Sequence, residues 1–280
     1  MPAPAPPPTV AEDVRRALAE DVGPGDLTAA LVPEALRLRG VLVAREAGVL
    51  CGCPWFEEAF RQAAPGTRIE WQVRESEAFP AGATLARLEG PARGLLTAER
   101  TALNFLQLLS GTASLTRRYV EAVAGTGAAI LDTRKTVPGL RAAQKYAVRC
   151  GGGRNHRLGL HDAILIKENH VAAAGSIGAA VAAARRLAPD VPLEVEVEDL
   201  DELEAALAAG APRILLDDFD LPTLREAVRR TAGRAVLEAS GGITLENVRA
   251  VAETGVDLIS VGALTKHVHA VDLSLRLEPP

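Results

Sequence analysis

The 280-residue chain is poor in lysine, in aromatic residues and in cysteine. Of its 31 basic residues only four are Lys, and the other 27 are Arg. Three of the four lysines, Lys135, Lys145 and Lys167, lie in a single window, residues 132–170. The same window holds three of the five His. Lys is a compact point charge with a tunable pKa, whereas Arg is a planar fork that stays charged. A chain that otherwise uses Arg is therefore expected to carry its chemistry in this window.

The shortage of aromatic residues and cysteines limits the core and the redox setting. Aromatic residues are 3% of the chain and hydrophobic residues 48%, so Leu, Val and Ala must fill the core. Cys51, Cys53 and Cys150 are an odd number without the spacing of a disulfide framework, which indicates a reducing cytoplasm. Cys51 and Cys53 could begin a zinc site, but no second pair follows, and buried thiols are the favoured interpretation.

The chain also lacks a long apolar run and an excess of positive charge. No stretch approaches the roughly 18 apolar residues that a membrane span needs. A net charge of −5 disfavours non-specific binding to nucleic acid. The Pro-rich start, residues 1–8, has neither the charged nor the apolar region of a signal peptide, and we expect an extended arm. We therefore expect a cytoplasmic protein that binds neither membranes nor nucleic acid.

Hydrophobic patterning predicts two domains and a C-terminal segment. Residues 1–112 mix strands and helices without strict alternation, which is typical of an α+β domain. A capping box over residues 9–12 predicts a helix that starts near Val10. The pair Ser110 and Gly111 predicts a break in a long helical segment. Residues 113–266 form the second domain, and residues 267–280 are expected to pack back on the first.

In the second domain, short apolar runs alternate with Ala-rich helical patterns. Near-continuous apolar strands of this kind are buried on both faces, as in parallel sheets. Six such units predict an α/β barrel or a doubly wound sheet. The predicted strands are 129–132, 163–167, 193–197, 214–217, 235–239 and 258–261.

Polar residues suited to chemistry end each of these strands, and parallel strands share one carboxyl edge. Lys167, Glu196 and Asp217 end three successive buried strands, which the general polarity of loops does not readily explain. Both carboxylates could hold a divalent metal carried by a polyphosphate, or stabilise a developing positive charge. Six candidate site cations are more than one phosphate requires, and they suit a ligand with several carboxylates or phosphates. They are Arg100, Arg134, Lys135, His156, Arg157 and Lys167.

The last two strand ends suggest a phosphate site. Ser240, Gly241 and Gly242 precede a helix expected near Leu245, and Gly262 opens another turn. Glycines let the backbone approach an anion, and helix N-termini offer free N–H donors. Tight turns explain each motif alone, but as a pair in the final two units they favour phosphate binding.

Motifs along nearly the whole chain resemble those of the quinolinate phosphoribosyltransferases. The central block is highly specific for this family, and further motifs precede and follow it in order. The matching segments are 20–26, 99–104, 132–136, 138–141, 144–148, 151–153, 155–160, 166–170, 194–196, 216–219, 238–242 and 260–265.

This resemblance implies an α/β fold, in which an N-terminal α+β sandwich domain is joined to an incomplete parallel α/β (TIM-like) barrel. It implies that quinolinate and phosphoribosyl pyrophosphate give nicotinate mononucleotide, CO₂ and pyrophosphate, with Mg²⁺, in NAD biosynthesis. It also implies a homodimer, or an oligomer based on it, in which Arg100 serves the site of the partner.

The resemblance also assigns roles to residues. Arg134, His156, Arg157 and Lys167, with Arg100 of the partner copy, would form the dicarboxylate pocket. Lys135 would lie between the acid and the ribosyl phosphates, and Thr133 would also bind substrate. Glu196 and Asp217 would face the ribose and its Mg²⁺. The 5′-phosphate would lie on Ser240, Gly241, Gly242 and Gly262.

One departure from the family and two rival functions stay open. Where many members carry His-Ser, this chain has Lys266 and His267. Two interpretations stay open: one of these residues replaces the usual histidine, or both lie in a solvated turn. A Schiff-base aldolase would also place a strand-end lysine, here Lys167, in a barrel with a phosphate site. A barrel that only binds a mononucleotide is the non-enzymatic alternative. We expect His161 and His170 to be turn and cap residues, and Lys145 to lie on a helix in a solvated or structural role.

Overall fold

The computed structural model describes residues 3–278, which form two compact units. Unit 1 contains the chain up to Arg117, the segment Val137–Gly152 and the chain from His267 onward. Unit 2 contains Arg118–Thr136 and Gly153–Lys266. Residues 137–152, which the sequence division gave to the second domain, thus group with unit 1. No helix in the described part of the chain is long and apolar enough to cross a membrane.

Unit 1 is built on an antiparallel sheet with the strand order β12-β1-β5-β3. The last strand pairs with β1, from Ala44 opposite Leu273 to Arg39 opposite Glu278. The C-terminal segment therefore completes the sheet that the first third of the chain begins. The strands of unit 1 are Arg37–Ala44 (β1), Gly48–Val49 (β2), Arg68–Trp71 (β3), Ala78–Phe79 (β4), Thr84–Pro91 (β5) and Leu273–Glu278 (β12).

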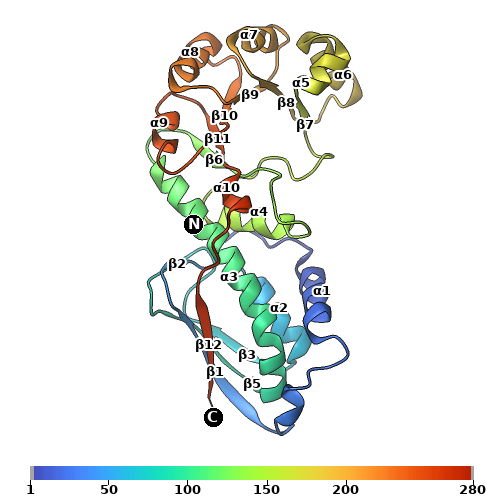
Figure 1. Ribbon diagram of the computed structural model, residues 1–280, viewed down its shortest axis with the longest axis vertical. Helices are drawn as coiled ribbons and strands as arrows, with labels where there is room; N and C mark the ends of the chain where they lie inside the picture. Colours follow the sequence, from blue (N-terminus) through green and yellow to red (C-terminus); the bar gives the residue numbers. More distant parts are fainter. Residues whose placement is uncertain (1–2, 279–280) are drawn as a thin grey trace. The chain divides into compact units, whose positions relative to one another are not determined.

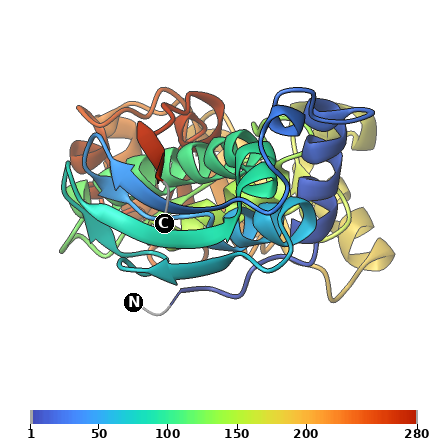
Figure 2. The same ribbon diagram turned by 90° about the horizontal axis from the view of Figure 1, so that it is seen from below.

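Helices cover this sheet and supply most of the core of unit 1. The helical elements are Val10–Val22 (α1), Ala29–Leu31 (η1), Cys53–Ala63 (α2), Ala92–Ala122 (α3), which continues into unit 2, and Arg141–Cys150 (α4). Figure 2 shows α3 lying over the layer of antiparallel strands. Trp55, Phe56 and Phe60 of α2 are fully buried in the core cluster, as is Leu42 of β1. The few aromatic residues of the chain are thus concentrated in one place.

The helix α1 begins at Val10, as the sequence predicts, but two other local details of unit 1 differ from the predictions. Thr9 does not cap α1 with its side chain, because its hydroxyl donates to Asp13 Oδ2 at 3.1 Å instead. The helix α3 continues through Ser110 and Gly111 without a break. Gly111 is needed for packing, since a Cβ there would lie 2.1 Å from the carbonyl oxygen of His269.

Unit 2 contains a parallel sheet with the strand order β6-β11-β10-β9-β8-β7. All six strands lie where the sequence predicts them, within two residues at each end. They are Ala129–Leu131 (β6), Ile164–Ile166 (β7), Leu193–Val197 (β8), Arg213–Asp217 (β9), Val236–Ser240 (β10) and Leu258–Ser260 (β11). In this order the first two strands, β6 and β7, lie at opposite edges, so the barrel is incomplete.

The helices of unit 2 follow the strands and lie outside the sheet (Figure 1). They are Glu168–Ala174 (α5), Ile177–Leu187 (α6), Leu200–Ala208 (α7), Leu221–Thr231 (α8), Val248–Ala252 (α9) and Ala263–Lys266 (α10). Beside β6, Arg154 forms a parallel bridge with Leu131. This bridge fixes the start of the loop that enters the open side of the sheet and carries His156 and Arg157.

Candidate active site

The carboxyl edge of the parallel sheet holds a pocket of about 240 Å³, and all of its lining residues belong to unit 2. Most of them are residues that the sequence singled out: Thr133, Arg134, Lys135, His156, Arg157, Lys167, Glu196, Asp217 and Ser240. The other lining residues are Leu165, Leu215, Glu238 and Ser260. Alternation along the strands explains the grouping, because residues two apart, such as Leu215 and Asp217, share one face.

Four predicted site residues are not among those that line this pocket. Gly241 and Gly242 follow Ser240 directly. Gly262 follows β11, separated from its last residue by Val261. Arg100 is an exposed residue of α3 and belongs to unit 1.

The two strand-end residues Lys167 and Glu196 form an ion pair. Lys167 Nζ lies 2.5 Å from Glu196 Oε2, and the Glu196 side chain is only 9% exposed. Lys167 also begins α5, where His170 Nδ1 accepts a hydrogen bond from its backbone N–H at 3.0 Å. This confirms the prediction that His170 is a cap residue. The lysine is thus held at both its backbone and its ammonium group.

Lys135 is held at the pocket by two threonines. Its backbone N–H donates to Thr133 Oγ1 at 3.0 Å, and its carbonyl oxygen accepts from Thr265 Oγ1 at 2.7 Å. Its side chain passes Gly262 so closely that a Cβ there would lie 3.1 Å from Lys135 Cδ. A side chain at position 262 would therefore press against Lys135, and the phosphate role predicted for Gly262 stays a prediction.

The glycine turn after β10 has the conformation that the sequence predicts. Gly241 and Gly242 have φ values of 95° and 56°, which disfavour other residues. A Cβ on Gly241 would also lie 2.6 Å from Asp218 Oδ1. The helix expected near Leu245 begins later, since α9 starts at Val248. Free N–H groups at this edge therefore come from the turn and not from a helix that follows it at once.

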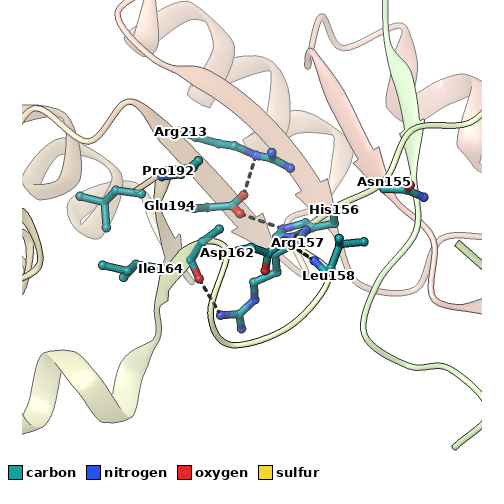
Figure 3. A pocket seen from close by; sticks show the side chains of 11 residues that line it. Asn155, His156, Arg157, Leu158, Asp162, Ile164, Pro192, Glu194 and Arg213 are labelled. Atoms are coloured by element: carbon teal, nitrogen blue, oxygen red, sulfur yellow. Dashed lines mark hydrogen bonds and ion pairs between the residues drawn. The ribbon is translucent and has the colours of Figure 1, made fainter. Parts of the chain in front are cut away.

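The inside of the sheet carries a charged cluster, of which Figure 3 shows Glu194, Arg213 and His156. The sequence did not single out Glu194 or Arg213 as site residues. Glu194 and Glu238 are 4% and 0% exposed. Arg213 pairs with both carboxylates, and its Nε lies 2.9 Å from Glu194 Oε1. Ser260 donates to Glu238. His156 Nε2 completes the cluster at 2.8 Å from Glu194 Oε2.

A second buried acid, Asp132, anchors the loop that carries His156. Asp132 is fully buried and accepts from His156 N–H at 2.9 Å and from Asn155 Nδ2 at 2.6 Å. The sequence marked Asp132 only as the start of a motif. Asp132 directly follows β6, and its carboxylate holds the loop that contains Asn155 and His156 through these two hydrogen bonds.

The two pocket arginines influence each other. Burial lowers the pKa of the Arg157 guanidinium, and the positive charge of Arg134 lowers it further. A pKa lowered by a neighbouring cation means that the two charges repel. An anion bound between them relieves this repulsion, so the pocket favours a ligand with more than one negative charge.

The structure brings Cys51 together with Glu75 and Cys150, whose possible ligand atoms lie within 4.8 Å of one another, and Cys53 is not part of this group. Cys51, Cys53 and Cys150 are all buried and free, which confirms the buried-thiol interpretation. Burial raises the pKa of the Cys51 and Cys53 thiols. Thiols that stay protonated are poor zinc ligands. Lys145 is also buried, at 1% exposure, so the solvated role considered for it is excluded.

Lys266 and His267, where the chain departs from the family pattern, are both exposed. Lys266 ends α10, and neither residue is among those that line the pocket. A solvated position at the rim therefore fits both residues better than a direct contact with a ligand in this pocket.

Comparison with known proteins places this geometry in a family. Residues 112–276 match the family model for the quinolinate phosphoribosyl transferase C-terminal domain, and residues 26–110 match the N-terminal domain model. A protein of Mycobacterium leprae named nicotinate-nucleotide pyrophosphorylase [carboxylating] is 48% identical over 275 residues, 95% of this chain and 96% of that protein. A probable nicotinate-nucleotide pyrophosphorylase [carboxylating] of Bacillus subtilis is 42% identical over 91% of this chain and 89% of its own.

A solved structure agrees with the sequence relatives. The nicotinate-nucleotide pyrophosphorylase from Francisella tularensis superposes with a TM-score of 0.95 at 46% identity and covers 98% of both chains. The likeness therefore extends over both units and is not confined to the sheet that carries the pocket.

Proposed function

Because this chain belongs to the quinolinate phosphoribosyltransferase family, we propose that it makes nicotinate mononucleotide from quinolinate and phosphoribosyl pyrophosphate. Pyrophosphate and CO₂ are the other products, and the reaction serves NAD biosynthesis. The observation that carries the proposal is the pocket itself, in which Arg134, Arg157 and Lys167 face Glu196 and Asp217. An anionic acid and a cation-like transition state require both signs of charge in one place.

The cations of the pocket bind the two carboxylates of quinolinate. Arg134 and Arg157 offer planar forks that suit carboxylates. Lys167 supplies a point charge at the end of β7. In the homodimer that we propose, Arg100 of the partner copy adds a further cation.

The remaining residues bind the ribosyl donor. Lys135, held by Thr133 and Thr265, lies where acid and phosphate groups meet. The turn of Ser240, Gly241 and Gly242 presents backbone N–H groups to the 5′-phosphate.

Glu196 and Asp217 stabilise the positive charge that develops on the ribose as pyrophosphate leaves. Their carboxylate oxygens also suit Mg²⁺, which is commonly held by one or two carboxylates together with substrate phosphates. Bound there, Mg²⁺ would neutralise the leaving pyrophosphate.

Decarboxylation follows from the first step. Once the ring nitrogen is joined to the ribose, it is cationic. The adjacent ring carbon keeps the electron pair of its bond to the departing CO₂, and the positive charge of the nitrogen stabilises that pair. The ring carbon then takes up a proton. The protein contributes position and charge neutralisation, because these residues hold the substrates in a fixed geometry.

The Schiff-base alternative is disfavoured by the partner of Lys167. An amine that attacks a carbonyl must be free of its proton and of a competing carboxylate. Lys167 Nζ instead lies 2.5 Å from Glu196 Oε2. Borohydride treatment in the presence of carbonyl substrates is expected to leave Lys167 unmodified.

Parallel assays with quinolinate and nicotinic acid test the proposal. With phosphoribosyl pyrophosphate and Mg²⁺, we expect nicotinate mononucleotide from quinolinate and little or none from nicotinic acid, which lacks the second carboxylate. Equal turnover of both acids would overturn the dicarboxylate pocket. Absence of nicotinate mononucleotide from both would overturn the activity.

A further inference from the structure

The cluster of Glu194, Arg213 and Glu238 is unusual for the inside of a barrel. Val, Ile and Leu dominate that space in most barrels. Buried carboxylates are costly unless they are paired and hydrogen-bonded. Here Arg213 pairs with both carboxylates, yet one guanidinium against two carboxylates leaves a negative charge. Ser260 donates to Glu238, and the ring of His156 lies against both carboxylates.

Both ring nitrogens of His156 are occupied by protein groups. Nε2 lies 2.8 Å from Glu194 Oε2 and 3.7 Å from Glu238 Oε1, so Glu194 is the nearer acceptor. On the other side of the ring, Nδ1 accepts a hydrogen bond from the Arg157 backbone N–H at 2.7 Å. Figure 3 shows the ring between Glu194 and the Arg157 segment. A nitrogen that accepts a hydrogen bond carries no proton, so the ring proton belongs on Nε2.

We propose that Glu194 is a positioning residue that fixes His156 as the Nε2–H tautomer and through it orients Arg157. The hydrogen bond at one ring nitrogen determines which tautomer is present, and hence what the other nitrogen can do. With its proton on Nε2, the ring offers a lone pair at Nδ1 to the Arg157 backbone. His156 therefore lines the pocket while its two ring nitrogens bind Glu194 and the Arg157 backbone.

The surroundings hold each part of this relay in place. Arg213 draws Glu194 Oε1, which leaves Oε2 for the ring. The backbone of His156 is fixed by Asp132 Oδ1 at 2.9 Å. Arg157 is tied at its far end as well, since its Nη1 donates to the Ala163 carbonyl at 3.3 Å. With the ends fixed, the state of the ring decides the direction of the Arg157 backbone N–H.

Nitrogen NMR of the protein labelled with ¹⁵N-histidine tests the tautomer directly. The resonances of His156 are assigned by their loss in His156→Asn. We expect Nε2 to carry the proton at neutral pH and Nδ1 to be unprotonated, with and without quinolinate. A proton on Nδ1, a doubly protonated ring, or a tautomer that changes when quinolinate binds would overturn the proposal.

Kinetics of Glu194→Gln test the consequence for Arg157, which rests on the proposed use of quinolinate. The amide can turn either its oxygen or its NH₂ group to the ring, so the tautomer is no longer fixed. We expect the KM for quinolinate to rise roughly tenfold, while the KM for phosphoribosyl pyrophosphate stays within about twofold of the wild type. Glu226→Gln, which removes a half-buried carboxylate that is paired with Arg229 and lies on a helix outside the pocket, is the control.

The outcomes separate the relay from simpler explanations. An unchanged KM for quinolinate in Glu194→Gln would overturn the relay, and an equal rise in both KM values would indicate a merely structural role. If the variant does not fold, the NMR measurement on the wild type still decides. If the wild type does not turn over quinolinate, the proposed function fails, whereas the tautomer is measured regardless.

Discussion

Lys167 Nζ and Glu196 Oε2 lie 2.5 Å apart at neighbouring strand ends, so the pocket pairs its own charges before it binds a substrate. In the proposed reaction, a carboxylate of quinolinate that binds Lys167 competes with Glu196 for the ammonium group. Glu196 is then released towards the ribosyl donor, where a negative charge is needed. This exchange links binding of the acid to preparation of the site for the second substrate.

Glu196→Gln tests this exchange by removing the competing charge. We expect quinolinate to bind up to roughly tenfold more tightly in the absence of phosphoribosyl pyrophosphate, because Lys167 loses its strongest internal partner. Turnover should fall by roughly 10²-fold, because the charge that stabilises the ribosyl cation is lost. Calorimetry and steady-state rates measure the two effects. Weaker binding of quinolinate by the variant would contradict the exchange.

Removal of the pocket cations should affect quinolinate more than the fold. For Arg134→Ala and Lys167→Ala we expect the KM for quinolinate to rise roughly 10- to 100-fold, as for lost hydrogen bonds to a charged group. Arg185→Ala, which removes an exposed arginine that donates to the Gly210 carbonyl, is the control. Thermal melting should show little change in all three. A large fall in melting temperature for the two pocket variants would mean that these residues are structural.

Thr265→Val should impair the use of phosphoribosyl pyrophosphate, because the Lys135 carbonyl loses its donor at 2.7 Å. We expect kcat/KM for this substrate to fall roughly tenfold and Thr265→Ser to restore it. Thr254→Val is the matched control, since Thr254 is also buried and donates to a backbone carbonyl, that of Val251. If both valine variants lose equal activity and stability, the hydroxyl of Thr265 has no special role.

Gly241→Ala should weaken binding of the 5′-phosphate. The residue has φ at 95°, and a Cβ would lie 2.6 Å from Asp218 Oδ1, so the turn must move. Gly233→Ala is the control, because its φ of 75° is also positive but no atom lies within 4 Å of its Cβ position. We expect both variants to lose stability and only Gly241→Ala to raise the KM for phosphoribosyl pyrophosphate. Equal KM values would remove this turn from the site.

Asp26 should give unit 1 a stability that depends on pH. The backbone N–H of Ala29 and the hydroxyl of Thr97 donate to its carboxylate and lower its pKa. Because the folded pKa is below the unfolded value of about 3.9, the contribution is present above that pH and is lost as the pH falls through the folded pKa. Asp26→Ala should therefore melt below the wild type at pH 7, and the gap should close in acid. A gap that does not depend on pH would contradict this assignment.

The sequence predicted the edge of the sheet well because local patterns determine it. The run Leu193–Val197 is a strand as expected, and Lys167, Glu196 and Asp217 line one pocket because parallel strands end together. The alternation of side chains along each strand predicts which residues share a face. It does not predict which strands are neighbours in the sheet. Only the strand order brings Glu194 beside Arg213.

Other features depend on contacts between residues distant in the sequence. Gly111 looked like a helix break because glycine disfavours helices, yet it serves the close approach of His269. Gly262 was predicted to be part of a phosphate site, and its lack of a side chain also accommodates Lys135. In each case the residue type was informative, and its reason lay in a neighbour that no local pattern reveals.

The central claim is that quinolinate is ribosylated and then decarboxylated in the pocket at the carboxyl edge of the sheet. Quinolinate labelled with ¹³C in the carboxylate next to the ring nitrogen tests it most directly. We predict labelled CO₂, pyrophosphate and nicotinate mononucleotide in equal amounts, no CO₂ without phosphoribosyl pyrophosphate, and a parallel loss of all three products in Asp217→Asn. Release of CO₂ without the ribosyl donor, or no release at all from the wild type, would contradict the account.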